Sequence, residues 1–167
     1  MKNMLLRDAV ESDLPAIVAI YNSTIASRMV TADTTPVSVE NRLPWFRDHY
    51  PNGRPLWVLE EEGVIAGWLS FQSFYGRPAY DGTVEVSIYV AEAFRGKGIG
   101  RFLLQQAIEA APSMGVHTLL GFIFAHNEPS LGLFEAFGFS RWGHLPRVAI
   151  LDGLERDLII CGRRVTG

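Results

Sequence analysis

Cysteine is almost absent from this chain. Its single cysteine, Cys161, cannot form an intramolecular disulfide, and no second cysteine exists to share a metal ion. Because Cys161 follows the apolar run at residues 158–160, we expect a small buried side chain rather than a nucleophile. The histidines His49, His117 and His144 lack the spacing of metal ligands, so we predict no metal site.

The chain also lacks an excess of positive charge and a long apolar run. It carries 15 Lys and Arg against 18 Asp and Glu, a formal net charge of −3, whereas a nucleic-acid binder normally shows a basic surface. No run approaches the roughly 20 apolar residues of a membrane helix, and the acidic Asp8 comes too early for a signal peptide. We therefore predict a cytoplasmic protein that binds neither nucleic acid nor membrane.

The apolar sequence that is present suffices for one ordinary domain. The 167 residues are 48% hydrophobic, which is typical of globular proteins, and no linker or repeat divides them, so we predict a single domain over residues 1–167. Periodicity and turn residues predict an α+β (α/β) fold, in which about four helices flank a mixed, mainly antiparallel sheet. The expected helices cover residues 12–22, 39–50, 99–111 and 127–137, and the expected strands residues 5–9, 56–60, 64–71, 83–90, 117–124, 140–144 and 155–161.

A glycine-rich loop joins the expected strand at residues 83–90 to the following helix. Glycines let the backbone approach a ligand closely, and the free N–H groups at a helix N-terminus favour an anion. Three cations add positive charge at the same point. The segment therefore predicts a phosphate site, made by Arg95, Gly96, Lys97, Gly98, Ile99, Gly100 and Arg101.

Three other interpretations of this loop can be compared with it. The dinucleotide fingerprint needs G-x-G-x-x-G, but the spacing here is G-x-G-x-G. The Walker loop needs G-x-x-x-x-G-K followed by Ser or Thr, which is absent. A solvated glycine turn is the simplest alternative, and the agreement of strand, loop, cations and helix argues against it.

The spacing that fits is R-x-x-G-x-G, which resembles the pyrophosphate loop of the GNAT superfamily of N-acetyltransferases. The opening L-R-D-A-V-E-S-D-L-P-A-I-V-A-I-Y-N and the later N-E-P-S-L-G-L-F-E-A-F-G-F are similar to other conserved segments of that superfamily. The segment A-Y-D-G-T-V-E-V-S-I-Y-V, at residues 79–90, is similar to its phosphinothricin and methionine sulfoximine acetyltransferases. The resemblance covers nearly the whole chain.

This resemblance implies acetyl-CoA as co-substrate and a GNAT-type fold. The loop at residues 95–101 would hold the pyrophosphate, and the backbone of Ile88, Tyr89 and Val90 would pair with the pantetheine arm. Asn127 would bond the pantetheine or acetyl end, with Ser130 beside it, although Asn127 could equally serve as a plain helix cap. The resemblance also makes a homodimer plausible.

Glu85 is the candidate general base for acetyl transfer to an amine. It is a charged residue in an otherwise apolar strand, where burial of a charge needs a reason. It alternates with Val84 and Val86 and so faces the other side of the sheet; an exposed strand position is the alternative. Many superfamily members place a tyrosine where this chain has Phe134, and that tyrosine serves as the general acid for the leaving thiolate. Phenylalanine cannot donate a proton. If an acid is needed, Tyr89 or His126 would have to serve.

A small amino-acid-like substrate needs a partner for its carboxylate. Arg77 matches a basic position of the phosphinothricin enzymes, whereas the methionine sulfoximine enzymes carry arginine where this chain has Tyr75; Arg28 and Arg42 are less favoured. Phe74, Tyr75 and Tyr80 are expected to wall the pocket, with ordinary loop packing as the alternative.

Two other functions remain open from the sequence. A protein or peptide N-acetyltransferase of the same fold would need an open groove, against which the aromatic loop at residues 74–80 argues. A non-catalytic acetyl-CoA-binding protein would not need Glu85, but the replacement at Phe134 is compatible with it.

Overall fold

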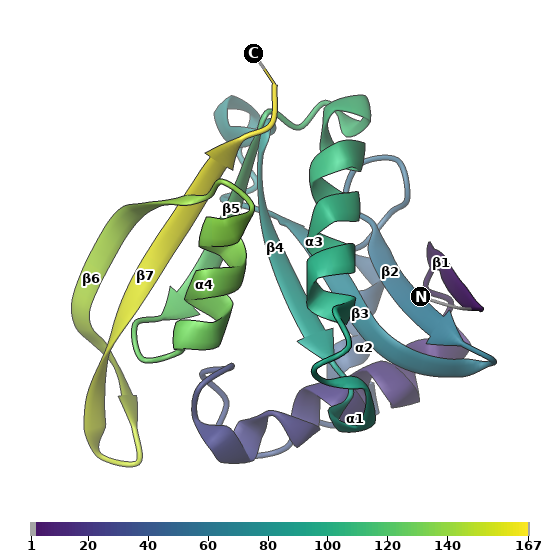
Figure 1. The fold of residues 1–167 in the computed structure, drawn as a ribbon, viewed down its shortest axis with the longest axis horizontal. Coiled ribbons are helices and arrows are strands. Elements are labelled where there is room, and N and C mark those ends of the chain that lie inside the picture. The colour runs from purple at the N-terminus through teal and green to yellow at the C-terminus, as the bar shows by residue number, and fades with distance from the viewer. Residues whose placement is uncertain (1–2, 167) are drawn as a thin grey trace.

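The computed structural model describes residues 3–166. It contains one seven-stranded sheet with the order β1-β2-β3-β4-β5-β7-β6, in which β4 and β5 are parallel and the other neighbours antiparallel. This confirms the predicted mixed, mainly antiparallel sheet with four α-helices (Figure 1). The elements are β1 (Met4–Asp8), α1 (Leu14–Ser23), α2 (Val39–Arg47), β2 (Leu56–Glu61), β3 (Val64–Ser73), β4 (Thr83–Val90), α3 (Ile99–Ala110), β5 (Thr118–Phe124), α4 (Glu128–Ala136), β6 (Ser140–Leu151) and β7 (Leu154–Arg164).

The helices divide between the two faces of the sheet. The apolar side of α3 packs with α4 on one face, where Leu103, Leu104, Val84 and Val86 are buried in a common core. Helix α1 and the adjoining α2 cover the other face (Figure 1). Alternate side chains of β4 therefore enter different environments, as the period of two in a strand requires.

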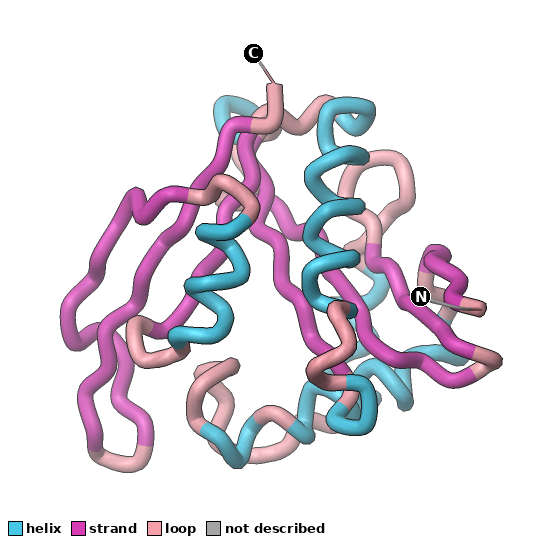
Figure 2. Tube along the Cα trace, viewed as in Figure 1, coloured by secondary structure: helices cyan, strands magenta, loops and turns pink. Residues whose placement is uncertain are grey.

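The last two strands are much longer than the sequence predicted. We expected residues 140–144 and 155–161, but β6 has 12 residues and β7 has 11, and they form a long hairpin (Figure 2). The register shifts between Leu145 and Ala149, so Pro146 lies in a bulge where its missing N–H breaks no ladder bond. At the tip, Asp152 and Gly153 both adopt positive φ, which suits a tight hairpin turn.

One smaller difference concerns the end of a helix. Helix α2 stops at Arg47, three residues before the predicted end, because the chain turns back through a bridge between Tyr50 and Arg54. Cys161 is buried as expected, and burial raises the pKa of its thiol.

The strands β4 and β5 separate soon after they meet. Their parallel pairing covers only Thr83–Glu85 of β4 and Thr118–Leu120 of β5. Beyond Glu85, β4 remains paired with β3 on its other side as far as Val90, but it leaves β5. The split opens a wedge in the middle of the sheet beside α4 (Figure 1), and residues of α4 line the cavity there.

Candidate functional site

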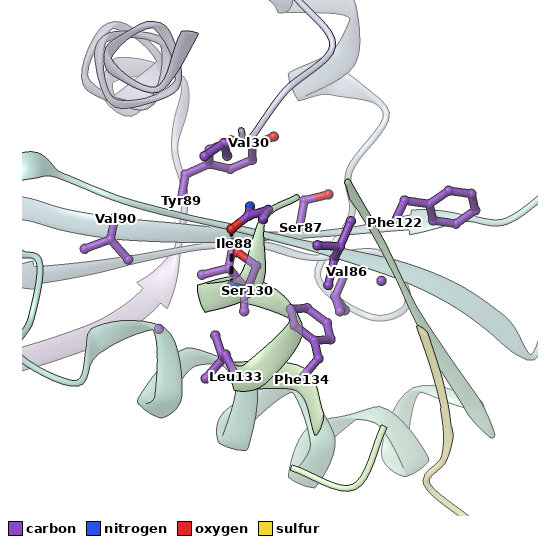
Figure 3. A pocket seen from close by; sticks show the side chains of 14 residues that line it. Val30, Val86, Ser87, Ile88, Tyr89, Val90, Phe122, Ser130, Leu133 and Phe134 are labelled. Carbon is purple, nitrogen blue, oxygen red and sulfur yellow. Dashed lines mark hydrogen bonds between the residues drawn. The ribbon is translucent and has the colours of Figure 1, made fainter. Parts of the chain in front are cut away.

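The wedge between β4 and β5 holds a cavity of about 170 Å³, which we name the α4-side cavity. Its wall is mostly apolar, and Leu133 and Phe134 of α4 point into it from the side of the sheet opposite to the Tyr89 side chain (Figure 3). The lining residues are Val30, Val86, Ser87, Ile88, Tyr89, Val90, Gly100, Gly121, Phe122, Ile123, Asn127, Ser130, Leu133 and Phe134.

The glycine loop forms one end of this region. Gly96 and Gly98 adopt φ values of 76° and 80°, and Gly98 is the N-cap of α3. A side chain would meet no atom within 4 Å at either position, so the left-handed backbone is what requires glycine. The backbone N–H groups that begin α3 thus present positive charge near Gly100, which lines the cavity.

Three exposed cations surround this helix start. The ammonium of Lys97 lies 5.3 Å from the ring centre of Phe94, and the Arg101 guanidinium lies 5.1 Å from that of Phe137. Arg95 lines a neighbouring hollow together with Ile88–Val90 and Ser130. Loop, helix dipole and cations therefore gather positive charge next to the α4-side cavity. That this charge binds an anion stays a prediction from the sequence.

Asn127 serves as the cap of α4 and also holds another segment. Its side-chain oxygen accepts a hydrogen bond from the Ser130 backbone N–H at 3.3 Å, and its amide nitrogen donates to the Met29 carbonyl at 3.1 Å (Figure 3 shows the cap bond). The residue is only 6% exposed. Asn127 is therefore a helix cap, which was the simpler of the two predicted roles. One N–H of its amide remains for a ligand in the cavity.

A second hollow, which we name the α2-side pocket, lies on the opposite face of β4. Glu85, Ser87 and Tyr89 reach it from β4, and Ser87 and Tyr89 also line the α4-side cavity. The two hollows therefore meet across one strand. The lining residues of the α2-side pocket are Tyr21, Arg42, Trp45, Trp68, Ser70, Gln72, Glu85, Ser87 and Tyr89.

Glu85 lies half-buried in this pocket, directly opposite Gln72 in the ladder between β3 and β4. Burial raises the pKa of its carboxyl above the ordinary value, and no charged partner within the described chain offsets this. A carboxylate with a raised pKa is a stronger base than an exposed one. The predicted alternative, a fully exposed strand position, does not describe this residue.

Arg42 brings a positive charge to the same pocket. Its guanidinium lies 4.6 Å from the ring centre of Tyr21 and 5.4 Å from that of Trp45, and it forms a 3.5 Å ion pair with Asp33. The Tyr21 hydroxyl donates a hydrogen bond to the same Asp33 carboxylate. These contacts fix the direction of the guanidinium, which can still bind a second anion through its remaining N–H groups.

The residues predicted to bind the substrate form a separate group. Phe74 and Tyr75 stack with ring centres 4.3 Å apart, and Tyr80 meets each of them edge-on, so the loop packs on itself. Arg77 is exposed in this loop and, like the three aromatic residues, is not among the residues that line the two hollows. The cluster approaches the α4-side cavity at Phe122, whose ring centre lies 6.4 Å from that of Phe74.

Phe134 occupies a close-packed position on the cavity wall. A Cβ added at Gly121 would lie 2.6 Å from its ring, so the strand passes directly over the ring because residue 121 is glycine. The ring also contacts Phe139, with centres 4.9 Å apart. Tyr89, in contrast, is partly buried and lines both hollows. Burial raises the pKa of its hydroxyl, which therefore stays protonated at neutral pH.

Comparison with known proteins identifies the class to which this fold and site belong. Residues 17–139 match the Acetyltransferase (GNAT) family, and the chain is therefore a member of it and an acetyl-CoA-dependent N-acetyltransferase. A Bacillus subtilis protein, YwnH, named provisionally as a phosphinothricin acetyltransferase, is 57% identical over 98% of this chain and 100% of its own. The L-methionine sulfoximine/L-methionine sulfone acetyltransferase of Pseudomonas aeruginosa is 37% identical over 92% of this chain and 90% of its own.

Two solved structures resemble the chain at nearly full length. A phosphinothricin acetyltransferase from Sinorhizobium meliloti, in complex with acetyl-CoA, is 31% identical, with a TM-score of 0.90 over 97% of this chain and 88% of its own. A protein from Brucella melitensis named ribosomal-protein-alanine N-acetyltransferase is 37% identical, with a TM-score of 0.90 over 96% of this chain and 99% of its own.

The described residues contain neither a membrane-spanning helix nor a cluster of metal-binding side chains. Between residues 3 and 166, no helix combines the length and apolarity needed to cross a bilayer. Over the same residues, no three side chains of His, Cys, Asp or Glu gather as metal ligands would.

Proposed function

We propose that this enzyme transfers the acetyl group of acetyl-CoA to the amine of a small amino-acid-like substrate, by direct attack of the amine on the thioester. The observation that carries the proposal is the position of Glu85, half-buried in a pocket that meets the α4-side cavity across β4. The relatives named for phosphinothricin and for methionine sulfoximine support this substrate class.

The α4-side cavity and the adjoining loop fit the coenzyme. The anion site at residues 95–101 would hold the pyrophosphate, since glycine at positive φ lets the backbone approach it. The backbone of Ile88–Val90 has lost its β5 neighbour and would pair with the pantetheine arm. Asn127 and Ser130, on the same cavity wall, would contact the arm nearer the thioester.

Glu85 would remove the proton from the substrate ammonium, directly or through one water molecule. The free amine then attacks the thioester carbon, the carbon–sulfur bond breaks to release the coenzyme thiolate, and the second proton of the nitrogen passes to solvent or to that thiolate. Because a thiol has a pKa of about 8.5, the thiolate can leave without a proton donor, which makes the replacement at Phe134 tolerable. Tyr89, protonated and in contact with both hollows, could still donate a hydrogen bond to the departing group.

Arg42 would bind the carboxylate of an amino-acid substrate, since its guanidinium faces the pocket that holds Glu85. Arg77 stays a prediction for this role, because the loop at residues 74–80 would have to close over the pocket to deliver it. Arg28 forms an ion pair with Asp152 at the hairpin tip.

The test is release of coenzyme A thiol from acetyl-CoA with a panel of amines. The panel holds phosphinothricin, methionine sulfoximine, methionine sulfone, the common amino acids, polyamines and peptides with alanine at the N-terminus. Turnover confined to free amino acids or their analogues is expected. Absence of turnover with every amine, despite acetyl-CoA binding, would contradict the proposal and favour a non-catalytic acetyl-CoA-binding protein.

A protein N-acetyltransferase is the second candidate, because the Brucella melitensis structure named for that activity is 37% identical. The α2-side pocket argues against it, since aromatic rings of Tyr21, Trp45 and Trp68 surround the Glu85 carboxyl. Preference for the peptides in the panel would reverse this order. A cytoplasmic location and a homodimer remain predictions from the sequence and the family resemblance.

A further inference from the structure

The floor of the α2-side pocket contains a serine that the reaction scheme above does not use. Ser70 is only 1% exposed, yet it lines this pocket. In the ladder between β3 and β4 it pairs with Ser87, while the next residue on the same face, Gln72, pairs with Glu85. Ser70 and Glu85 are therefore diagonal neighbours on one face of the sheet, roughly 7–8 Å apart by strand geometry. An amine bound between them could contact both.

The hydroxyl of Ser70 has a fixed partner behind it. His49, just after α2, approaches the Ser70 oxygen with Nε2 at 2.6 Å, and its Nδ1 lies 2.9 Å from the Trp45 carbonyl oxygen. A carbonyl can only accept, so Nδ1 carries the hydrogen. In the neutral ring Nε2 must then accept, and the Ser70 hydroxyl must donate to it.

Two features stabilise the neutral His49 ring in this orientation. Burial is the main influence on the imidazole and lowers the pKa of His49, which favours the neutral ring at pH 7 despite the adjacent Asp48. The ring edge of Trp45 packs on the imidazole, with centres 4.8 Å apart. Since the Ser70 proton points toward His49, the serine oxygen can present only lone pairs to the pocket.

We infer that Ser70 accepts a hydrogen bond from the substrate ammonium or amine, and that His49 is the positioning residue that sets the direction of the Ser70 hydroxyl. This inference rests on the proposed function. It assigns the pocket three complementary contacts for an amino acid: Glu85 and Ser70 for the amine, and Arg42 for the carboxylate. A hydroxyl turned the other way would direct its own proton at the ammonium and oppose binding.

The first test compares Ser70→Ala with the wild type by steady-state kinetics. We expect the KM for the amine to rise roughly ten- to hundredfold, the range for loss of a hydrogen bond to a charged group. The KM for acetyl-CoA should not change, because the serine lies on the far side of β4 from the α4-side cavity. A merely structural serine would alter both constants, or neither.

The second test addresses His49. His49→Phe removes the acceptor and should raise the amine KM nearly as far as Ser70→Ala does. His49→Gln, whose amide oxygen can accept from Ser70, should restore part of the loss. If His49→Phe unfolds the protein, the comparison of Ser70→Ala with His49→Gln still decides, because Gln is expected to have the smaller effect.

The chain offers a matched control in a second histidine–hydroxyl pair. His117 Nδ1 lies 2.7 Å from the hydroxyl of Thr118, which is buried but is not among the residues lining the two hollows. Thr118→Val should leave the amine KM unchanged. If the wild type is active and Ser70→Ala has the same amine KM as the wild type, the inference about Ser70 is overturned but the proposed function is not. A wild type that acetylates no amine overturns the proposed function, and this inference with it.

Discussion

The α4-side cavity and the α2-side pocket lie on opposite sides of β4 but are assembled in different ways. Except for Val30, the α4-side cavity is lined by residues between 86 and 134, from one continuous stretch of β4, α3, β5 and α4. The α2-side pocket collects residues from four separate elements, between Tyr21 and Tyr89. The first site is a product of local chain order, whereas the second depends on how distant elements pack.

The two sites also differ in chemistry. The α4-side cavity is mostly apolar, with positive charge on an exposed loop beside it, which suits the long acetyl-CoA molecule of the proposed function. The α2-side pocket places the Glu85 carboxyl, the Arg42 guanidinium and hydroxyl groups among aromatic rings. On the proposed function, the coenzyme site would be common to many relatives, while the α2-side pocket would determine which amine is acetylated.

The largest effect that would sharpen this comparison is expected from Glu85→Gln. Loss of the base should lower kcat about a hundredfold or more, while the Kd for acetyl-CoA, measured by calorimetry, stays near the wild-type value. Glu109→Gln, on the exposed side of α3, is the matched control and should be neutral. Unchanged turnover in Glu85→Gln would remove Glu85 as the base.

The pH dependence should follow the same carboxyl. Because burial raises the Glu85 pKa, its protonated, inactive form persists to a higher pH than in an ordinary glutamate. Below that pKa, kcat/KM should fall about tenfold per pH unit, and above it this limb should level off. In Glu85→Gln the limb should be absent. An acidic limb that survives this substitution would belong to another group.

The two arginines provide the next prediction. Arg42→Ala should raise the KM for an amino-acid substrate about tenfold or more, because a charge-assisted contact to the carboxylate is lost. Arg77→Ala should have a smaller effect, and both differences should shrink with the substrate amide, which lacks the carboxylate. The reverse ranking would show that the loop at residues 74–80 closes over the α2-side pocket and delivers Arg77.

The contrast between the two sites explains what the sequence could predict. The spacing of Arg95, Gly98 and Gly100 predicts the anion site, because strand, loop and helix are consecutive and the required φ angles limit the residue type. Alternation within β4 predicts that Glu85 faces away from the core formed by Val84 and Val86. These inferences need only local geometry. The structure agrees with the order of strand, loop and helix and with the alternation in β4, while anion binding itself stays a prediction.

The rest needed tertiary information. Ser70 and Gln72 do alternate with the buried Phe71, a signal that they share one face of β3, but nothing local says that this face meets Arg42 or His49. The sequence favoured Arg77 over Arg42 because Arg77 matches a basic position of the phosphinothricin enzymes, and no local pattern places Arg42 beside Glu85. The predicted strand at residues 140–144 was likewise too short, because the accommodation of Pro146 in a bulge depends on the partner strand β7.

The smallest predicted effect concerns the loop itself. Gly98→Ala forces a side chain into a φ of 80°, which costs about 1–2 kcal/mol in a left-handed backbone, so the loop should relax and the KM for acetyl-CoA should rise several-fold. The amine KM should not change. Gly115→Ala is the matched control, because Gly115 has a φ of 75°, has the same free space around it, and is not among the residues lining either hollow. Both variants should lose a similar amount of thermal stability. A difference between their KM values for acetyl-CoA would then reflect the position of the glycine. If Gly115→Ala weakens acetyl-CoA as much as Gly98→Ala does, strain has spread through α3, and the loop geometry is not a local property of the coenzyme site.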